Sequence, residues 1–176
     1  HFGHPTRKWN PKMDNFIFTK KSKSHVIDLE KTLNQLEKAR KLIIEVVSNG
    51  GQCIMVGTKL QASSTIQEEA VRSESFYVNQ RWLGGMLTNF PTMKSRVDTL
   101  KTIETTVSTA DSKTNTKKEL QVLATKAKKL KKFFGGLVGI EKLPDLVFLV
   151  DTEMEINAVN EAKKLGIPIV AIVDTN

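Results

Sequence analysis

Two aspartates occupy positions where α/β proteins bind ligands. Asp151 directly follows the apolar run Leu146–Val150, and Asp174 follows Ile169–Val173. Such runs are typical of buried parallel strands, whose carboxyl ends form the crevice that holds ligands in open α/β sheets. If the two strands are neighbours, the carboxylates lie close enough to share a structural divalent metal ion, with His4 as a further ligand. The alternative is that each aspartate only caps the loop or helix that follows it.

Other patterns of catalytic and nucleotide-binding sites are absent from the sequence. Gly57-Thr58-Lys59 follows the apolar run Cys53–Val56, as a phosphate loop would, but it lacks the glycine spacing and the Lys-Ser/Thr order of a Walker loop. No dinucleotide fingerprint and no nucleophile elbow follows any apolar run. The sequence therefore predicts that the protein is not an enzyme. A nucleotide- or metal-dependent enzyme on an α/β parallel sheet is the alternative, and a coiled-coil adaptor is a third possibility.

Positive charge is concentrated in two segments. The chain of 176 residues has a formal net charge of +8. Residues 1–25 hold six Lys or Arg against one acidic residue, and residues 117–132 hold seven Lys against one. Such concentration favours a polyanionic partner, although the lysines of the second segment could equally form a solvated helix face. A single cysteine excludes an internal disulfide, and no apolar run is long enough to cross a membrane.

Aromatic rings and amides lie among the cations, which indicates an RNA-binding surface. Lys and Arg neutralise phosphates, while exposed rings stack on bases. The first expected cluster consists of Arg7, Lys8, Trp9, Asn10, Lys12, Lys20, Lys21 and Lys23. The second lies around Arg81 and Trp82, where the tryptophan could equally pack in the core.

The remaining patterns predict the elements that position these residues. Apolar runs alternate with amphipathic helical periodicity, which is typical of βαβ units and of a parallel sheet covered on both faces. Two stripes spaced 3 and 4 apart around a polar turn predict an antiparallel helical hairpin whose stripes pack on each other. The predicted organisation is an irregular basic segment at 1–25, an α/β domain at 26–88 and 135–176, and a hairpin (coiled coil) at 89–134.

Six motifs along the chain carry a family resemblance. They are His1-Phe2-Gly3-His4, Arg7–Met13, Val56–Lys59, Arg81–Asn89, Leu143-Pro144-Asp145 and Leu165–Asn176. Together they closely resemble the S-two family (universal uS-two) of small-subunit ribosomal proteins, in its bacterial or organellar form. The family normally has further segments before and after these motifs, so we expect the chain to be part of a longer protein.

The resemblance implies a three-layer flavodoxin-like (Rossmann-like) parallel sheet with the helical hairpin inserted into it. It implies a structural role in the small ribosomal subunit, with small-subunit rRNA and other small-subunit ribosomal proteins as partners, including the S-one protein in bacteria. It adds Thr58 and Lys59 to the residues expected near RNA. It implies no required cofactor, no membrane, no homo-oligomer, and a place on ribosomes of the bacterial cytoplasm or, alternatively, of a mitochondrion or plastid.

Overall fold

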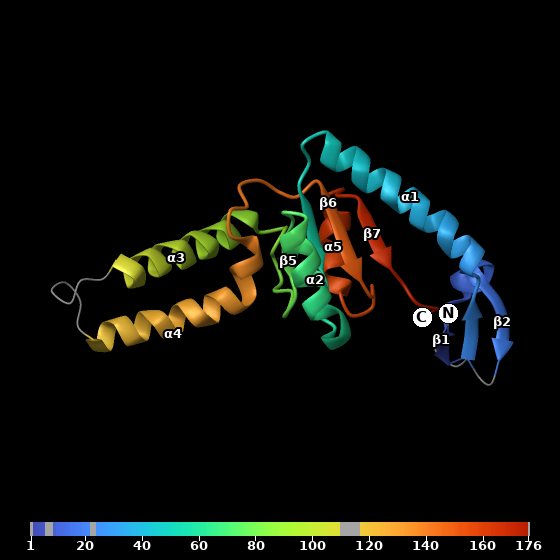
Figure 1. Ribbon diagram of the computed structural model, residues 1–176, viewed down its shortest axis with the longest axis horizontal. Coiled ribbons are helices and arrows are strands. Elements are labelled where there is room, and N and C mark those ends of the chain that lie inside the picture. Colours follow the sequence, from blue (N-terminus) through green and yellow to red (C-terminus); the bar gives the residue numbers. More distant parts are fainter. Residues whose placement is uncertain (1, 6–8, 22–23, 110–116, 176) are drawn as a thin grey trace.

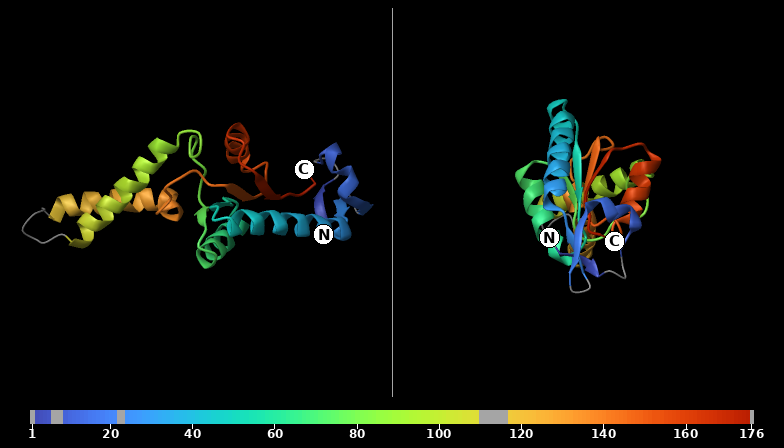
Figure 2. Two further views of the ribbon diagram at one scale, coloured as in Figure 1. Left: turned by 90° about the horizontal axis from the view of Figure 1, so that it is seen from above. Right: turned by 90° about the vertical axis from the view of Figure 1, so that its right-hand side faces the viewer.

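A helical hairpin, an α/β body and a small antiparallel sheet follow one another along the molecule (Figure 1). The computed structural model describes residues 2–5, 9–21, 24–109 and 117–175, without the side chains of residues 4, 5, 109 and 117. Both chain ends lie at the end of the molecule opposite the hairpin (Figures 1 and 2). Within the described part of the chain, no helix is long and apolar enough to span a membrane.

The body is built on a four-stranded parallel sheet with the order β5-β4-β6-β7. Its strands are β4 (Cys53–Val56), β5 (Phe76–Val78), β6 (Leu146–Val150) and β7 (Ile169–Ile172). The helices α1 (Leu29–Ser48), α2 (Leu60–Arg72) and α5 (Ile156–Lys164) connect or flank these strands. The predicted α/β parallel sheet is therefore confirmed.

Side-chain alternation along the strands assigns each helix to one face of the sheet. Ile54 pairs with Val147, and both side chains lie in the core cluster that contains Ala158 and Ala162 of α5. Their neighbours in sequence point the other way and pack on α1, through Ala39, Leu42, Ile43 and Val46. Successive strand residues point to opposite faces, so a run of apolar residues buries both faces. The result is the three-layer arrangement seen end-on in Figure 2.

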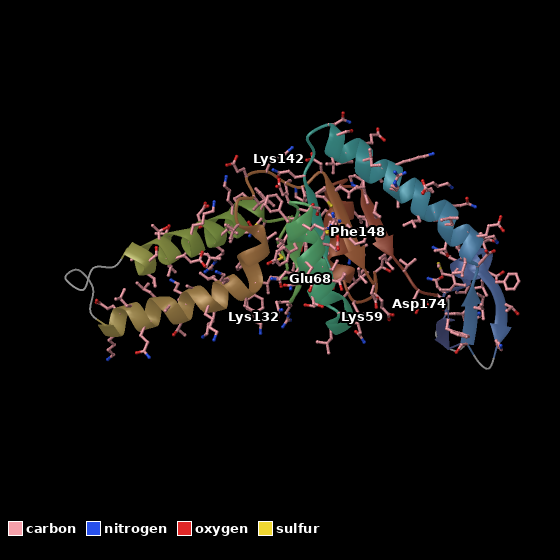
Figure 3. The ribbon with its side chains drawn as sticks, viewed as in Figure 1. Lys59, Glu68, Lys132, Lys142, Phe148 and Asp174 are labelled. Carbon is pink, nitrogen blue, oxygen red and sulfur yellow. The ribbon has the colours of Figure 1, made fainter. Side chains whose placement is uncertain are left out.

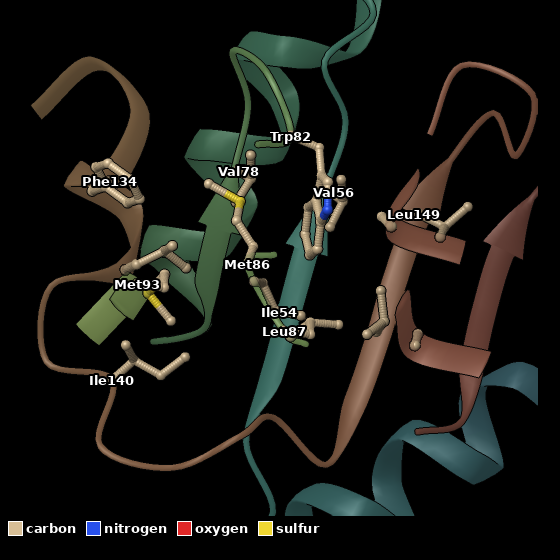
Figure 4. Close-up of a cluster of buried hydrophobic side chains, with 14 of the residues drawn as sticks. Ile54, Val56, Val78, Trp82, Met86, Leu87, Met93, Phe134, Ile140 and Leu149 are labelled. Atoms are coloured by element: carbon tan, nitrogen blue, oxygen red, sulfur yellow. The ribbon is translucent and has the colours of Figure 1, made fainter. Parts of the chain in front are cut away.

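The hairpin consists of α3 (Phe90–Thr109) and α4 (Lys117–Phe134), which lie side by side (Figure 1). Met93, Val97 and Leu100 of the predicted α3 stripe are buried, and Lys131 forms an ion pair across to Glu104 at 2.9 Å. The prediction that the stripes pack only on each other is wrong at the base of the hairpin. Met93, Val97 and Phe134 belong to the same core cluster as the strands of the body (Figure 4), because both helices start or end against the sheet.

The N-terminal segment forms a second sheet where the sequence analysis predicted irregular structure. Strands β1 (Phe2–Pro5), β3 (Ser24–Ile27) and β2 (Ile17–Lys21) pair antiparallel in that order, and the 3-10 helix η1 (Pro11–Phe16) precedes β2. The strands are short, and β2 is almost entirely exposed, so they lack the apolar alternation that predicts a strand. This N-terminal sheet joins the body through a backbone hydrogen bond of 2.8 Å from Asn10 N to Thr175 O.

Candidate nucleic-acid interface

Exposed lysines cover the outer side of α4. The apolar residues of the helix face α3, which leaves a lysine-rich side turned to solvent. We call this side the basic face of α4, and it consists of Lys118, Lys126, Lys128, Lys129 and Lys132, all exposed. Figure 3 shows side chains extending outward along this helix, with Lys132 near its C-terminal end. Lys131 and Lys132 in the last turn also complement the negative end of the helix dipole, so the same charges stabilise the helix.

The N-terminal sheet carries a second group of cations around one aromatic ring. Lys20 Nζ lies 5.3 Å from the centre of the Trp9 ring, and the imidazole of His25 lies 5.1 Å from it. Lys12 and Lys21 are exposed nearby in sequence. A lysine this close to an indole gains a cation–π attraction, so Lys20 and the Trp9 ring contact each other within the protein.

Several of the predicted RNA-binding residues here have other local roles or lie outside the described residues. Asn10 Oδ1 accepts a hydrogen bond from Lys12 N at 3.0 Å and so caps η1. Arg7, Lys8 and Lys23 lie outside the described residues.

Internal carboxylates occupy the carboxyl edge of the parallel sheet. Thr58 donates both its backbone N–H (2.7 Å) and its hydroxyl (2.6 Å) to Glu155 Oε1, and Glu155 is only 2% exposed. Lys59 Nζ lies 3.0 Å from Asp151 Oδ2. The donors that would receive a phosphate in a nucleotide-binding protein therefore already have carboxylate partners.

One member of the predicted aspartate pair has a lysine partner. Partial burial raises the pKa of Asp151, but Lys59 and the backbone N–H groups of Met154 and Glu153 together outweigh this effect, and the pKa is lowered. A lysine ammonium thus offsets the charge of Asp151. Among the described residues, no group of three His, Cys, Asp or Glu side chains could hold a metal ion, and the side chain of His4 lies outside them.

Asp174 makes a local contact of the kind that the capping alternative allows. It lies on the segment that leads from β7 towards the N-terminal sheet (Figure 3), and its Oδ1 accepts the N–H of Thr175 at 2.6 Å. A side chain at Gly3 would collide with Thr175 at 2.7 Å, so β1 lies directly on this segment. The N-terminal segment therefore contacts the residues that follow β7, through Gly3 and the backbone of Asn10.

The second predicted RNA cluster is divided between solvent and core. Arg81 is exposed, whereas Trp82 is 6% exposed and lies in the core beside strand residues such as Val56 (Figure 4). Its indole N–H donates to Glu161 Oε1 at 3.0 Å. A buried ring has no open face for a nucleobase, so Trp82 serves packing, which the sequence analysis held equally open.

Two acidic residues that the sequence analysis missed organise the site. Glu155 holds the loop after β4, and Glu161 of α5 holds the loop after β5. Their partners are 73 to 97 residues away in the chain, so local patterns contain no sign of the pairing. One local feature of the sequence could have indicated Glu161 as a residue with an internal partner. It is a charged residue directly before Ala162, which is buried on the amphipathic helix α5.

Comparisons with known proteins find matches that extend over the whole chain. A family model described as Ribosomal protein S2 matches residues 1–176. The chain is 52% identical over 176 residues to the Small ribosomal subunit protein uS2 of Dictyoglomus thermophilum, covering 100% of the chain and 72% of that protein. It is 49% identical to the proteins of the same name from Mycobacteroides abscessus and Mycolicibacterium vanbaalenii, again over 100% of the chain. The chain spans 64% of the length of each of these two relatives.

Proposed function

The chain belongs to the ribosomal protein S2 family, and we propose that it is a structural constituent of the small ribosomal subunit that binds rRNA in support of translation. The observation that carries this proposal is the match of the family model to residues 1–176. The role is not enzymatic. In support, the donors Thr58 and Lys59 at the sheet edge, where α/β enzymes bind their substrates, are already engaged by Glu155 and Asp151. We propose that this role needs no cofactor.

The rRNA-binding surface combines the two basic regions at opposite ends of the molecule with one arginine between them. The basic face of α4 presents five exposed lysines, and the N-terminal sheet presents Lys12, Lys20 and Lys21. Arg81 is exposed on the loop that leads into α3. Arg7, Lys8 and Lys23 belong to the same proposal through their place in the family motifs and their charge. Separated basic regions suit a protein that contacts more than one segment of a folded RNA.

Partners and location follow from the family. We propose that neighbouring small-subunit proteins, including the S-one protein if the source is a bacterium, contact the chain, which acts as a single copy rather than a homo-oligomer. The three similar proteins come from bacteria, which supports ribosomes of a bacterial cytoplasm as the location. Ribosomes of a mitochondrion or plastid are the alternative.

A salt titration of rRNA binding tests the proposed surface. Replacing Lys129 and Lys132 with Gln should weaken binding and reduce the slope of log K against log salt by about 1.5, since each lost phosphate contact removes roughly 0.7–0.9 from the slope. The matched control replaces Lys38 and Lys41 with Gln, which removes the same charge from exposed positions of α1. Equal effects of the two pairs would show that only net charge matters, and would refute the basic face of α4 as the binding surface.

A further inference from the structure

One carboxylate collects the donors of the loop that joins the body to the hairpin. We call Arg81–Asn89 the 81–89 loop. Glu161 Oε1 accepts the N–H of Gly85 at 2.8 Å in addition to the Trp82 indole N–H at 3.0 Å. Glu161 Oε2 accepts the N–H of Leu87 and of Thr88, both at 2.9 Å, and the Thr88 hydroxyl at 3.0 Å. Four residues of this nine-residue loop thus donate hydrogen bonds to a single side chain.

The geometry of the loop requires an acceptor at this point. Gly85 has a φ of +88°, a conformation that residues with a side chain rarely adopt. Successive backbone N–H groups that converge in this way form a concave anion-binding nest. An ionised carboxylate accepts at both oxygens and donates nothing, so it satisfies every donor. The donors also outweigh the effect of partial burial, which raises the pKa of Glu161, so that the pKa is lowered.

The same loop continues directly into the hairpin. Asn89 N donates to Gly85 O at 2.9 Å, and Met93 N donates to Asn89 O at 3.2 Å, so the hydrogen bonds of the loop run on into the first turn of α3. Met93 is buried in the core of the body. A side chain on α5 therefore fixes both the loop that presents Arg81 and the start of the hairpin that presents the basic face of α4.

We infer that Glu161 is a positioning residue for RNA binding. It orients Arg81 and sets the direction of the α3–α4 hairpin relative to the α/β body, so that the arginine and the lysines of α4 meet one RNA in a fixed geometry. The RNA part of this inference rests on the proposed function, whereas the control of hairpin direction does not. Glu161 itself need not touch RNA, since its oxygens already accept the five donors of the loop.

The first test measures hairpin direction without RNA. Spin labels on cysteines introduced at Ser64 of α2 and Thr125 of α4, both exposed, report the distance between body and hairpin. Glu161→Gln keeps the size of the side chain but turns an NH₂ group towards N–H donors of the loop. We expect a broadened distance distribution in Glu161→Gln and an unchanged one in the matched control Glu68→Gln, which removes an exposed carboxylate from α2. An unchanged distribution in folded Glu161→Gln would overturn the inference.

The second test measures coupling to RNA at a temperature where each variant is folded. Arg81→Ala and Glu161→Gln should each weaken rRNA binding, Glu161→Gln by about tenfold, the equivalent of one charge-assisted hydrogen bond. If Glu161 acts by positioning Arg81, the double variant should bind only slightly less well than Glu161→Gln alone. Fully multiplicative effects would show that Glu161 contributes only general stability.

A milder variant keeps the test decisive if Glu161→Gln does not fold. Thr88→Val removes one donor to Glu161 Oε2 and leaves the backbone bonds in place. It should show the same non-multiplicative coupling with Arg81→Ala, at a smaller size, and multiplicative effects would refute the inference. If the unmodified chain fails to bind rRNA, the proposed function fails and the RNA part of the inference with it. If that chain binds but Thr88→Val and Glu161→Gln leave both affinity and hairpin distances unchanged, only the inference fails.

Discussion

The hydrogen bonds of Glu161 should make the stability of the protein depend on pH in the acid range. The pKa of this carboxyl is lowered from an ordinary value of 4.5 in the folded state. A lowered folded-state pKa means that the ionised group stabilises the fold above the unfolded-state pKa, and that this contribution is lost as pH falls through the folded-state pKa. The wild-type chain should therefore lose stability as pH falls below about 4.5.

The size of the effect follows from the partners of the carboxylate. Five donors reach two oxygens, and a hydrogen bond to a charged group contributes roughly 1.5–3 kcal/mol when it is made alone. The bonds share their acceptors and the side chain is only half-buried, so we discount the sum for screening and expect Glu161→Gln to cost about 2–4 kcal/mol at pH 7. For a chain of this length, that corresponds to a fall in Tm of about 5–15 °C.

Urea unfolding followed by tryptophan fluorescence measures this cost directly. Trp82 is buried and donates to Glu161, so its emission reports the region concerned. The difference in unfolding free energy between wild type and Glu161→Gln should be largest at pH 7 and should shrink as pH falls below about 4.5 and through the lowered folded-state pKa, because protonation then removes the same charge from the wild type. A difference below about 0.5 kcal/mol at pH 7, or one that is constant with pH, would refute the reasoning.

Three further predictions concern the hairpin and the core. Deleting residues 101–126 and closing the gap with a short Gly-Ser linker should leave a folded body, because the base of the hairpin stays in the core, and circular dichroism with a cooperative melt checks this. Gly136→Ala should destabilise the protein by about 1–3 kcal/mol, since its Cβ would collide with the carbonyl oxygen of Tyr77, whereas Gly84→Ala, with nothing within 4 Å, should not have this effect in the same urea assay. Burial raises the pKa of the Cys53 thiol to about 11, so alkylation at pH 8 should be slow in the native protein and fast in urea, and rapid native labelling would contradict its placement.

The sequence predicts the parallel sheet well where strands are apolar throughout. The run at 53–56 is a strand over those residues, and the run at 146–150 is another. The shortest strand, Phe76–Val78, has three residues and shows no distinct pattern. The three-stranded N-terminal sheet is missed because β2 is almost entirely exposed and its strands are too short to show apolar alternation, so only their pairing reveals the sheet.

The site is predictable only where charge itself is the signal. The lysines of α4 are exposed, as a solvated or RNA-facing surface requires, and the sequence identifies them from composition alone. The partners of Thr58, Lys59 and Trp82 lie between 79 and 97 residues away, on the segment and helix that follow β6. Only the fold brings such groups together, so the sequence could suggest these residues as ligand-binding but could not show that internal carboxylates occupy them.

Co-sedimentation with small ribosomal subunits tests the central claim most directly. The purified chain is mixed with bacterial small subunits stripped of their own S2-family protein and run through a sucrose gradient at increasing salt. We expect the chain to travel with the subunit at about one copy each in low salt, and to be released as salt rises, because its basic surfaces contact phosphates. A chain that stays at the top of the gradient at low salt would contradict a structural role in the small subunit.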